Sequence, residues 1–252
     1  MIYENYFSGA FCYTPTLQDF RQGQTELVLY NPAAQPCRCT LTAYFTAKPP
    51  CELPAITVQP ETNAVLVMPD VNREIFADCG FWGGKIISDS PLMINVVDGP
   101  VQQDPQKPMY RGGCTNYHGT QLHAEWRFPD GLWLEWMKLF GGEASKAPSP
   151  FNECELYYFL NPHPFDVGLE VTLQYQHLPH VTQPILLPAE RLYVWDNFEK
   201  VEFVKNYALH AVATAPITIT AVRQLYGLHG VQEWGKVIHC AMIGIPGPVP
   251  QD

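Results

Sequence analysis

The sequence has 252 residues, of which 46% are hydrophobic and only 16% are charged, so the chain can bury a full core and its composition argues against intrinsic disorder. Fifteen basic residues against 25 acidic ones give a net charge of −10, which repels phosphate backbones and argues against nucleic acid as a partner. Abundant aromatic residues and 24 prolines favour short strands joined by turns over long helices.

The N-terminal residues 1–5 have neither a basic flank nor a long apolar run. They predict no signal peptide and no insertion into a membrane, so a cytoplasmic protein is expected. Six of the eight cysteines lie in the first half of the sequence, and no two are spaced as Cys-x-x-Cys. In a cytosolic chain this pattern favours small buried side chains over a zinc or redox site.

A comparison of the sequence with itself finds the same segments twice, in the same order. Residues 26–32, a strand pattern that runs into an Asn-Pro turn, recur as residues 155–162. Residues 40–44 correspond to residues 172–175. In the second copy, apolar residues alternate with polar ones, as is typical of a half-buried strand; the apolar set is Leu169, Val171, Leu173 and Tyr175.

Two further blocks continue the match. Residues 58–68, a proline turn followed by a strand, correspond to residues 187–195. Residues 86–94, two strands around a tight turn, correspond to residues 211–219. The offset drifts only from about 130 to about 125 residues, so four matched blocks indicate duplication more strongly than shared strand composition does.

The matched blocks predict an all-β fold of two tandem antiparallel β-sandwich, or jelly-roll-like, domains with little helix, residues 1–117 and 118–252. The one helix candidate is residues 132–140, where Trp133, Trp136, Met137 and Phe140 share one face of a 3.6-residue period. The glycine pair at residues 141–142 fits the end of that helix.

The second copy contains a series of short motifs. Trp126 is followed by the acidic-Gly pair Asp130-Gly131, which we interpret as a turn, and a later strand ends in the Asn161-Pro162 turn. A Pro-hydrophobic strand then ends in Arg223, and residues 239–244 form a short apolar segment. This series resembles the sensory rhodopsin transducer family.

The first copy matches the same pattern more loosely. Residues 7–9 stand in place of the Trp-to-Gly opening, and Asp98 stands in place of Arg223. The resemblance implies a β-sandwich that forms homotetramers and binds a small, carbohydrate-like ligand, with only a few members partnering a rhodopsin. Because a duplicated chain resembles two fused subunits, the implied assembly is a homodimer with four domains.

Tryptophans crowd around the predicted turn at Asp130, with Trp126, Trp133 and Trp136 within eleven residues. Exposed aromatic rings pack on the C–H faces of sugars while nearby polar groups bind the hydroxyls. We therefore predict Trp126, Asp130 and Trp133, with His210 later in the copy, as ligand-binding residues. The alternative is that the tryptophans fill the core or the contact between the copies.

Arg223 lies at the end of an alternating strand, where a fixed guanidinium would bind a carboxylate or phosphate through two hydrogen bonds. The alternative is a surface ion pair or a subunit contact. Asp98 reverses the charge at the corresponding point of the first copy, so the two copies are not expected to bind the same ligand. The second copy is predicted to carry the working site.

The eight histidines are the main argument for an enzyme. Neutral imidazoles with a carboxylate hold Zn²⁺, Mn²⁺ or Fe²⁺ in many β-sandwich and barrel proteins. The first candidates are His118, His123 and Glu125, which lie close together in the sequence, and later ones are His210, His229 and His239. Their spacing matches no specific metal motif, and no His-Glu-x-x-His sequence is present.

The sequence therefore leads to three hypotheses. The first is a non-catalytic protein that binds a sugar or sugar acid and needs no cofactor. The sequence has no Gly-x-Ser-x-Gly elbow, which would indicate a catalytic serine, and no dinucleotide fingerprint. The second is a metal-dependent sugar-modifying enzyme that uses a subset of the histidines. The third is a signalling adaptor whose apolar surfaces bind a membrane receptor.

Overall fold

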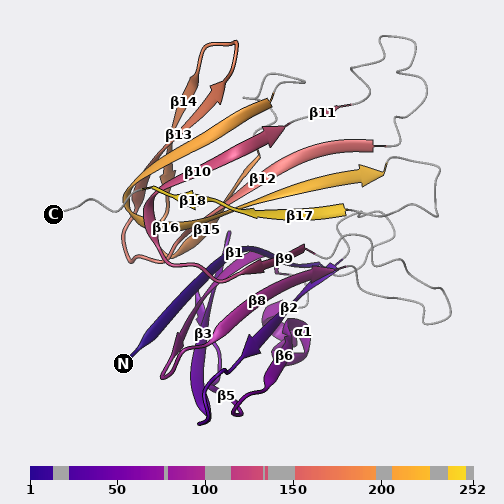
Figure 1. Ribbon diagram of the computed structural model, residues 1–252, viewed down its shortest axis with the longest axis vertical. Coiled ribbons are helices and arrows are strands. Elements are labelled where there is room, and N and C mark those ends of the chain that lie inside the picture. Colours follow the sequence, from indigo (N-terminus) through magenta and orange to yellow (C-terminus); the bar gives the residue numbers. More distant parts are fainter. Residues whose placement is uncertain are drawn as a thin grey trace.

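The computed structural model describes residues 1–13, 23–76, 79–99, 115–132, 134–135, 151–196, 206–227 and 238–247. Within these residues the chain consists of antiparallel strands and two one-turn helices, which confirms the predicted all-β class (Figure 1). We call the part that ends with β9 at His118 the first half, and the remainder the second half. In Figure 1 the indigo-to-magenta strands of the first half lie below the orange-to-yellow strands of the second.

The first half is a two-layer sandwich. One layer has the order β3–β7–β1, with the short strands β4 and β5 on the free side of β3, and the other has the order β6–β2–β8–β9. The layers join where the ends of β1 and β2 pair. The elements are β1 (Tyr3–Tyr13), β2 (Gly23–Tyr30), β3 (Cys37–Phe45), β4 (Cys51–Glu52), β5 (Ile56–Val58), β6 (Asn63–Val67), α1 (Met68–Val71), α2 (Arg73–Phe76), β7 (Gly80–Ser88), β8 (Met93–Gly99) and β9 (Thr115–His118).

The second half has one layer in the order β14–β13–β16–β10–β18 and another in which β12 lies between β15 and β16. The 22-residue strand β16 belongs to both layers, since its first part pairs with β10 and β13 and its second part with β12 and β17. The elements are β10 (His123–Leu132), β11 (Leu134–Glu135), β12 (Phe151–Asn161), β13 (Val167–Tyr175), β14 (Val181–Leu187), β15 (Arg191–Asp196), β16 (Asn206–Gly227), β17 (Ile238–Ile243) and β18 (Ile245–Pro246).

Corresponding strands pair in the same way in the two halves. β2 pairs with β6 and β8, and β12 pairs with β15 and the second part of β16. β7 lies between β1 and β3, and the first part of β16 lies between β10 and β13. Even the register shifts correspond, between Phe7 and Ala10 on β1 and between Phe128 and Gly131 on β10.

This register shift corrects the interpretation of Asp130-Gly131 as a turn. Both residues lie inside β10, where the shift marks a β-bulge. A bulge adds one residue to a strand without reversing the chain, and small residues such as glycine tolerate it in the way that they tolerate turns.

The Asn-Pro turns have the same buried hydrogen bonds in both halves. Nδ2 of Asn31 donates to the carbonyl oxygens of Gln35 and Val58 at 2.8 and 3.1 Å. Nδ2 of Asn161 donates to the carbonyl oxygens of Phe165 and Leu187 at 2.9 and 3.2 Å. The Oδ1 atom of each asparagine accepts from the backbone two residues later, at 3.0 Å. Each amide therefore ties its turn to the end of a neighbouring strand.

Strand β12 is buried on both faces. Tyr157 and Phe159 point into the core of the second half, whereas Leu156, Tyr158 and Leu160 form a separate cluster with Tyr44 of the first half. This explains why the sequence of β12 is a continuous apolar run instead of an alternating one.

Polar contacts accompany this cluster between the halves. Oγ of Ser8 donates to the carbonyl oxygen of Tyr158 at 3.1 Å. Oγ of Ser8 also lies 3.0 Å from Oγ1 of Thr220. Gly9 has a φ of +88°, and a Cβ atom there would lie 2.8 Å from the Tyr158 ring, so this close approach requires glycine.

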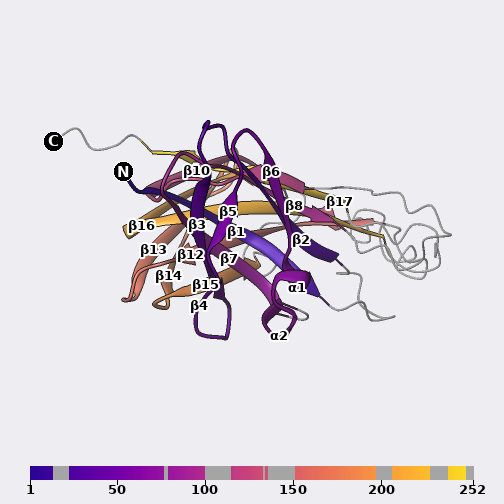
Figure 2. The same cartoon turned by 90° about the horizontal axis from the view of Figure 1, so that it is seen from below.

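The helices differ from the sequence prediction. Both lie in the first half, side by side near one end of the sandwich (Figure 2), where α2 packs Phe76 against Trp82 at a ring separation of 5.0 Å. The predicted helix at 132–140 is wrong where it is described, since Leu134–Glu135 pairs with β12 as β11. Pairing with a neighbouring strand outweighs the helical periodicity. Residues 133 and 136–140 lie outside the described residues.

The prediction of buried cysteines agrees with the structure for four of the five described side chains, and Cys51 is partly exposed. Cys12, Cys37, Cys39 and Cys79 are buried in the core of the first half, and burial is the main cause that raises the pKa of the Cys39 thiol to about 11. These thiols therefore serve as small apolar core groups.

Candidate functional site

The outer face of the β14–β13–β16–β10 layer carries an ordered set of polar side chains. Along β13, Glu170 and Thr172 point outward while their neighbours are buried. Across the sheet, Thr172 lies opposite His210 of β16, which lies opposite Arg127 of β10. In the next row, Glu170 lies opposite Val212. The period-2 geometry of strands therefore brings residues of three separate segments to one surface.

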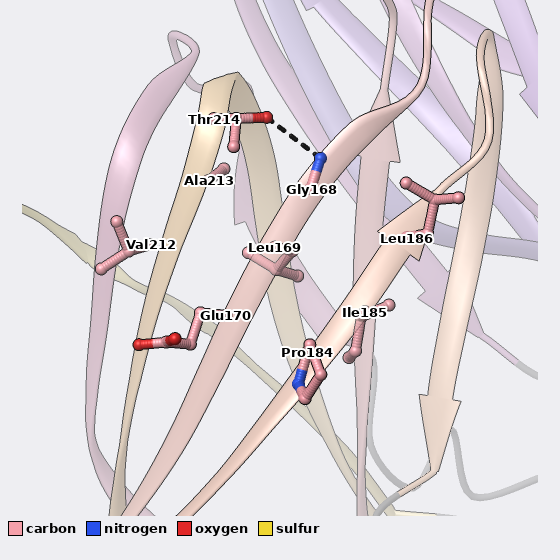
Figure 3. Close-up of a pocket in the computed structure, with 9 residues that line it drawn as sticks. All are labelled: Gly168, Leu169, Glu170, Pro184, Ile185, Leu186, Val212, Ala213 and Thr214. Atoms are coloured by element: carbon pink, nitrogen blue, oxygen red, sulfur yellow. Dashed lines mark hydrogen bonds between the residues drawn. The ribbon is translucent and has the colours of Figure 1, made fainter.

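A groove of about 700 Å³ crosses this face between β14 and β16 (Figure 3). Gly168 and Thr214 lie at one end, where the backbone N–H of Gly168 donates to Oγ1 of Thr214 at 3.0 Å. Glu170 and Val212 lie toward the other end. It is open to solvent rather than enclosed. The lining residues are Gly168, Leu169, Glu170, Pro184, Ile185, Leu186, Val212, Ala213 and Thr214.

The groove depends on Gly168, which contributes no side chain. In the first half, Cys39 pairs with Ile56 in the way that Leu169 pairs with Ile185 in the second half. Arg38, which precedes Cys39, therefore occupies the position that corresponds to Gly168. The backbone N–H of Arg38 donates to Oδ1 of Asp89 at 2.9 Å, just as Gly168 donates to Thr214. The backbone arrangement is thus shared, but a long exposed side chain stands in the first half where the second half has an open floor.

A charged cluster lies in the strand rows next to the groove. Oε1 of Glu125 accepts from Nη2 of Arg127 and lies next to Nε2 of His210, both at 2.8 Å. The hydrogen bonds from Arg127 and His210 lower the pKa of the Glu125 carboxyl group. Glu125 pairs with Val212 in the strand register, so this cluster borders the groove, with its carboxylate already engaged by two partners.

The first half has a related cluster at the same register positions. Glu4 accepts a hydrogen bond from the Tyr6 hydroxyl at 2.6 Å and forms an ion pair with Lys85 at 2.9 Å. The Tyr6 hydrogen bond is the largest cause that lowers the Glu4 pKa, followed by that of Lys85. Tyr6 pairs with Lys85 as Arg127 pairs with His210. The carboxylate is common to the halves, and its partners differ.

The structure places the predicted ligand-binding tryptophan in the core. Trp126 is 1% exposed, and its Nε1 donates to the carbonyl oxygens of His123 and Ile217 at 3.1 and 3.0 Å. The proposed stacking of a sugar on Trp126 does not fit this placement, because the indole offers no face to solvent. The alternative raised by the sequence, that the ring fills the core, describes its position.

The other predicted ligand-binding residues are only partly described. Trp133 lies outside the described residues, and of Asp130 only the backbone is described. The backbone of Arg223 pairs with Glu155 and with Cys240, and its side chain lies outside the described part. His210 is brought together with Glu125, 85 residues away in the sequence.

The predicted metal site is also only partly described. Within the described residues, no three His, Cys, Asp or Glu side chains lie together as metal ligands would. The His123 ring packs edge-on against Trp126 at 5.2 Å, and Glu125 faces two basic side chains. The side chain of His118 lies outside the described residues, so the set of His118, His123 and Glu125 stays a prediction.

Sequence reasoning missed the residues that line the groove. The alternation along β13 contained a signal for Glu170, because it places this residue on the face opposite Leu169 and Val171. A second signal was the contrast between Gly168 and Arg38 at corresponding strand positions of the two halves. Thr214 and Leu186 had no comparable signal, because their neighbourhood depends on how β14 and β16 flank β13.

No protein-family model matches the sequence, and no curated protein matches it. Among solved structures, the chain is similar to Thermotoga maritima 1070, with a TM-score of 0.39, 13% identity, and coverage of 51% of this chain and 97% of that one. It is also similar to the Anabaena sensory rhodopsin transducer, with a TM-score of 0.31, 17% identity, and coverage of 40% and 97%. The similarity to a Bacteroides uniformis β-glucuronidase has a TM-score of 0.19 and 9% identity, covering 96% of this chain and 25% of that one.

In the described residues, no helix is both long enough and apolar enough to span a membrane.

Proposed function

We propose that the protein is a non-catalytic binding protein for a neutral carbohydrate, and that the ligand lies in the groove of the second half. The observation that carries this proposal is the mixed lining of the groove. One carboxylate, Glu170, and one hydroxyl, Thr214, are set among aliphatic side chains on a rigid sheet. Sites of this kind hold small molecules that have both apolar faces and hydrogen-bonding groups.

The chemistry of each wall suits a sugar. Leu186 and Val212 are exposed aliphatic residues on which the C–H face of a pyranose ring packs. The two oxygens of Glu170 accept hydrogen bonds from neighbouring hydroxyls, and bonds to a charged acceptor are among the stronger ones. Oγ1 of Thr214 accepts the bond from Gly168, so its hydroxyl proton is directed to another acceptor.

A neutral sugar fits the groove better than a sugar acid. The carboxylate of Glu170 lies in the groove and repels an anion. Arg127 and His210, the basic groups in the adjoining strand row, are engaged with Glu125. A uronic acid would have to compete with Glu125 for these partners, whereas a neutral hydroxyl has no such competitor.

We also propose that the two halves are divergent copies of one domain and that the second is the working copy. The shared strand pairings and the two identical asparagine turns support the duplication. The contrast between Arg38 and Gly168 supports the choice of half. The predicted homodimer stays a prediction, which molar-mass determination by light scattering would test.

The test is a thermal-shift and calorimetry panel on the full chain. It compares glucose, galactose, mannose and their disaccharides maltose, cellobiose, lactose and mannobiose with glucuronic and galacturonic acid. At least one neutral sugar should stabilise the protein, and the acids should bind more weakly. Gly168→Arg, which introduces the first-half residue, should weaken binding by about tenfold or more because the side chain fills the groove.

The matched control is Arg38→Gly, which makes the reciprocal change in the first half and should leave sugar affinity unchanged. Glu170→Gln should weaken binding by about tenfold, since it replaces a charged acceptor with a neutral one. Stoichiometric metal in protein purified without a histidine tag would favour the enzyme hypothesis instead. If no neutral sugar stabilises the wild-type protein, the proposed function is wrong.

A further inference from the structure

An aromatic pair, of which one ring is exposed, lies on the turn that leads into β13. The ring of Phe165 stacks on that of His163, with the ring centres 5.0 Å apart and the planes inclined by 13°. Phe165 is nevertheless 53% exposed. Among the exposed large hydrophobic side chains of the described residues, Phe165 is the only aromatic one.

Hydrogen bonds hold this turn in place. The backbone carbonyl of Phe165 accepts from Nδ2 of the buried Asn161 at 2.9 Å, and the backbone N–H of His163 donates to Oδ1 of the same residue at 3.0 Å. Nε2 of His163 donates to the carbonyl oxygen of Pro216 at 2.7 Å. The Phe165 ring is therefore positioned in advance, which lowers the entropy lost when a ligand binds it.

The fold does not need the aromatic pair. The same turn in the first half has Ala33 and Gln35 at the positions of His163 and Phe165, and the amide of Asn31 makes the corresponding bonds. The aromatic rings are thus an addition to a turn that forms without them.

The pair lies at one end of the groove. Gly168 is three positions after Phe165 in the chain, so their Cα atoms are at most about 11 Å apart. His163 is bonded to Pro216, and Gly168 is bonded to Thr214, two residues before Pro216 on β16. The turn therefore adjoins the end of the groove formed by Gly168 and Thr214, opposite the end with Glu170 (Figure 3).

We propose that Phe165, supported by His163, is a platform that stacks on a second sugar ring of a ligand bound in the groove. The ligand class is then a neutral saccharide of at least two linked units, one against Leu186 and Val212 and the next over Phe165. Aromatic rings bind the C–H faces of sugars in this way. This inference rests on the proposed function of the groove.

The test compares each disaccharide of the panel, namely maltose, cellobiose, lactose and mannobiose, with its component monosaccharides by calorimetry on the full chain. At least one disaccharide should bind about three- to tenfold more tightly than its monosaccharide. Phe165→Gln, which introduces the first-half residue, should abolish this preference without changing monosaccharide affinity. Phe165→Tyr should retain the preference, and His163→Ala, which removes the supporting ring, should reduce it.

The outcomes separate the two proposals. If monosaccharides bind but no disaccharide is preferred, or if Phe165→Gln keeps the preference, the platform is wrong and the groove stands. If no sugar of the panel binds the wild-type protein, the proposed function fails and the platform fails with it. An unchanged unfolding temperature of Phe165→Gln would show that the comparison concerns folded protein.

Discussion

In the first half, Arg38 extends from the outer face at the position where the second half has Gly168 and an open groove. In contrast, Asn31 and Asn161 make matching buried hydrogen bonds in the two halves. Buried amides that satisfy several backbone groups tolerate little change. Residues on the outer face of a sheet change at small cost in stability, so a difference in function between the halves is expected on that face.

The charged clusters show an intermediate case. Glu4 and Glu125 occupy the same register position and both accept hydrogen bonds from a neighbour on the same strand. Their partners across the strands differ, with Lys85 in the first half and His210 in the second. The carboxylate is the same in both halves while its partners differ, as a half-exposed position allows.

The largest expected effect tests whether Trp126 belongs to the core. Trp126→Ala should destabilise the protein by about 3–5 kcal/mol, because it removes a fully buried aromatic side chain. Urea unfolding measures this loss. Trp126→Phe, the milder control, should unfold at lower urea but bind sugars with wild-type affinity. Altered sugar affinity in folded Trp126→Phe would show that Trp126 contributes to sugar binding.

The next effect tests whether the halves share one turn. Asn161→Ala should destabilise the protein by about 2–3 kcal/mol, since it leaves buried backbone carbonyls without a donor. Asn31→Ala should cost a similar amount, measured by the same urea unfolding. A negligible loss for one variant and a large loss for the other would break the equivalence of the turns.

A smaller effect, with the opposite sign, concerns two strained residues. Glu61 and Glu190 have φ values of +54° and +51°, a conformation that is costly for any residue other than glycine. Glu61→Gly and Glu190→Gly should each stabilise the protein by about 0.5–1 kcal/mol, after the entropy cost of glycine is subtracted. Thermal unfolding measures the change, and Glu190→Ala, which keeps the strain, is the control. Destabilisation by both glycines would show that the glutamate side chains make contacts worth more than the strain.

The smallest effect concerns pH. The pKa of the Glu125 carboxyl is lowered in the folded protein by Arg127 and His210. Its contribution to stability is therefore present above the ordinary carboxyl pKa of about 4.3 and is lost as the pH falls through the folded value. Glu125→Gln should be less stable than wild type at neutral pH, and the difference should vanish in acid.

The matched variant for this pH comparison is Glu4→Gln. In the wild-type protein, the pKa of the Glu4 carboxyl is lowered by Tyr6 and then by Lys85. It should show the same pH dependence of the unfolding free energy. If the difference in unfolding free energy between either variant and wild type persists unchanged in acid, the carboxylate of that half does not stabilise the protein through its charge.

Much of the fold is predictable from the sequence because its signals are local. The alternation from Leu169 to Tyr175 predicts β13, and the Asn-Pro pairs mark turns whose asparagines are fixed by neighbouring backbone. The bulge at Gly131 and the strand β11 are not predictable, since both are set by pairing with distant strands, β16 and β12.

The candidate site was harder to predict for the same reason. Glu125 and His210 meet only through the pairing of β10 with β16, and nothing near either residue in the sequence indicates the other. Trp126 is misleading because a tryptophan beside polar residues has the same local pattern in a core as in a sugar site. The contrast between Arg38 and Gly168 becomes informative only when the two halves are aligned strand by strand.

The most direct test of ligand binding in the groove is a methyl NMR titration of the full chain with the neutral sugar that gives the largest thermal shift. The groove of the second half predicts that the methyl signals of Ile185, Leu186 and Val212 shift on binding, while those of Ile56 and Ile87 at the corresponding positions of the first half do not. Shifts confined to the first-half methyl signals, or binding that shifts no methyl signal of the groove, would show that the ligand does not bind in the second-half groove.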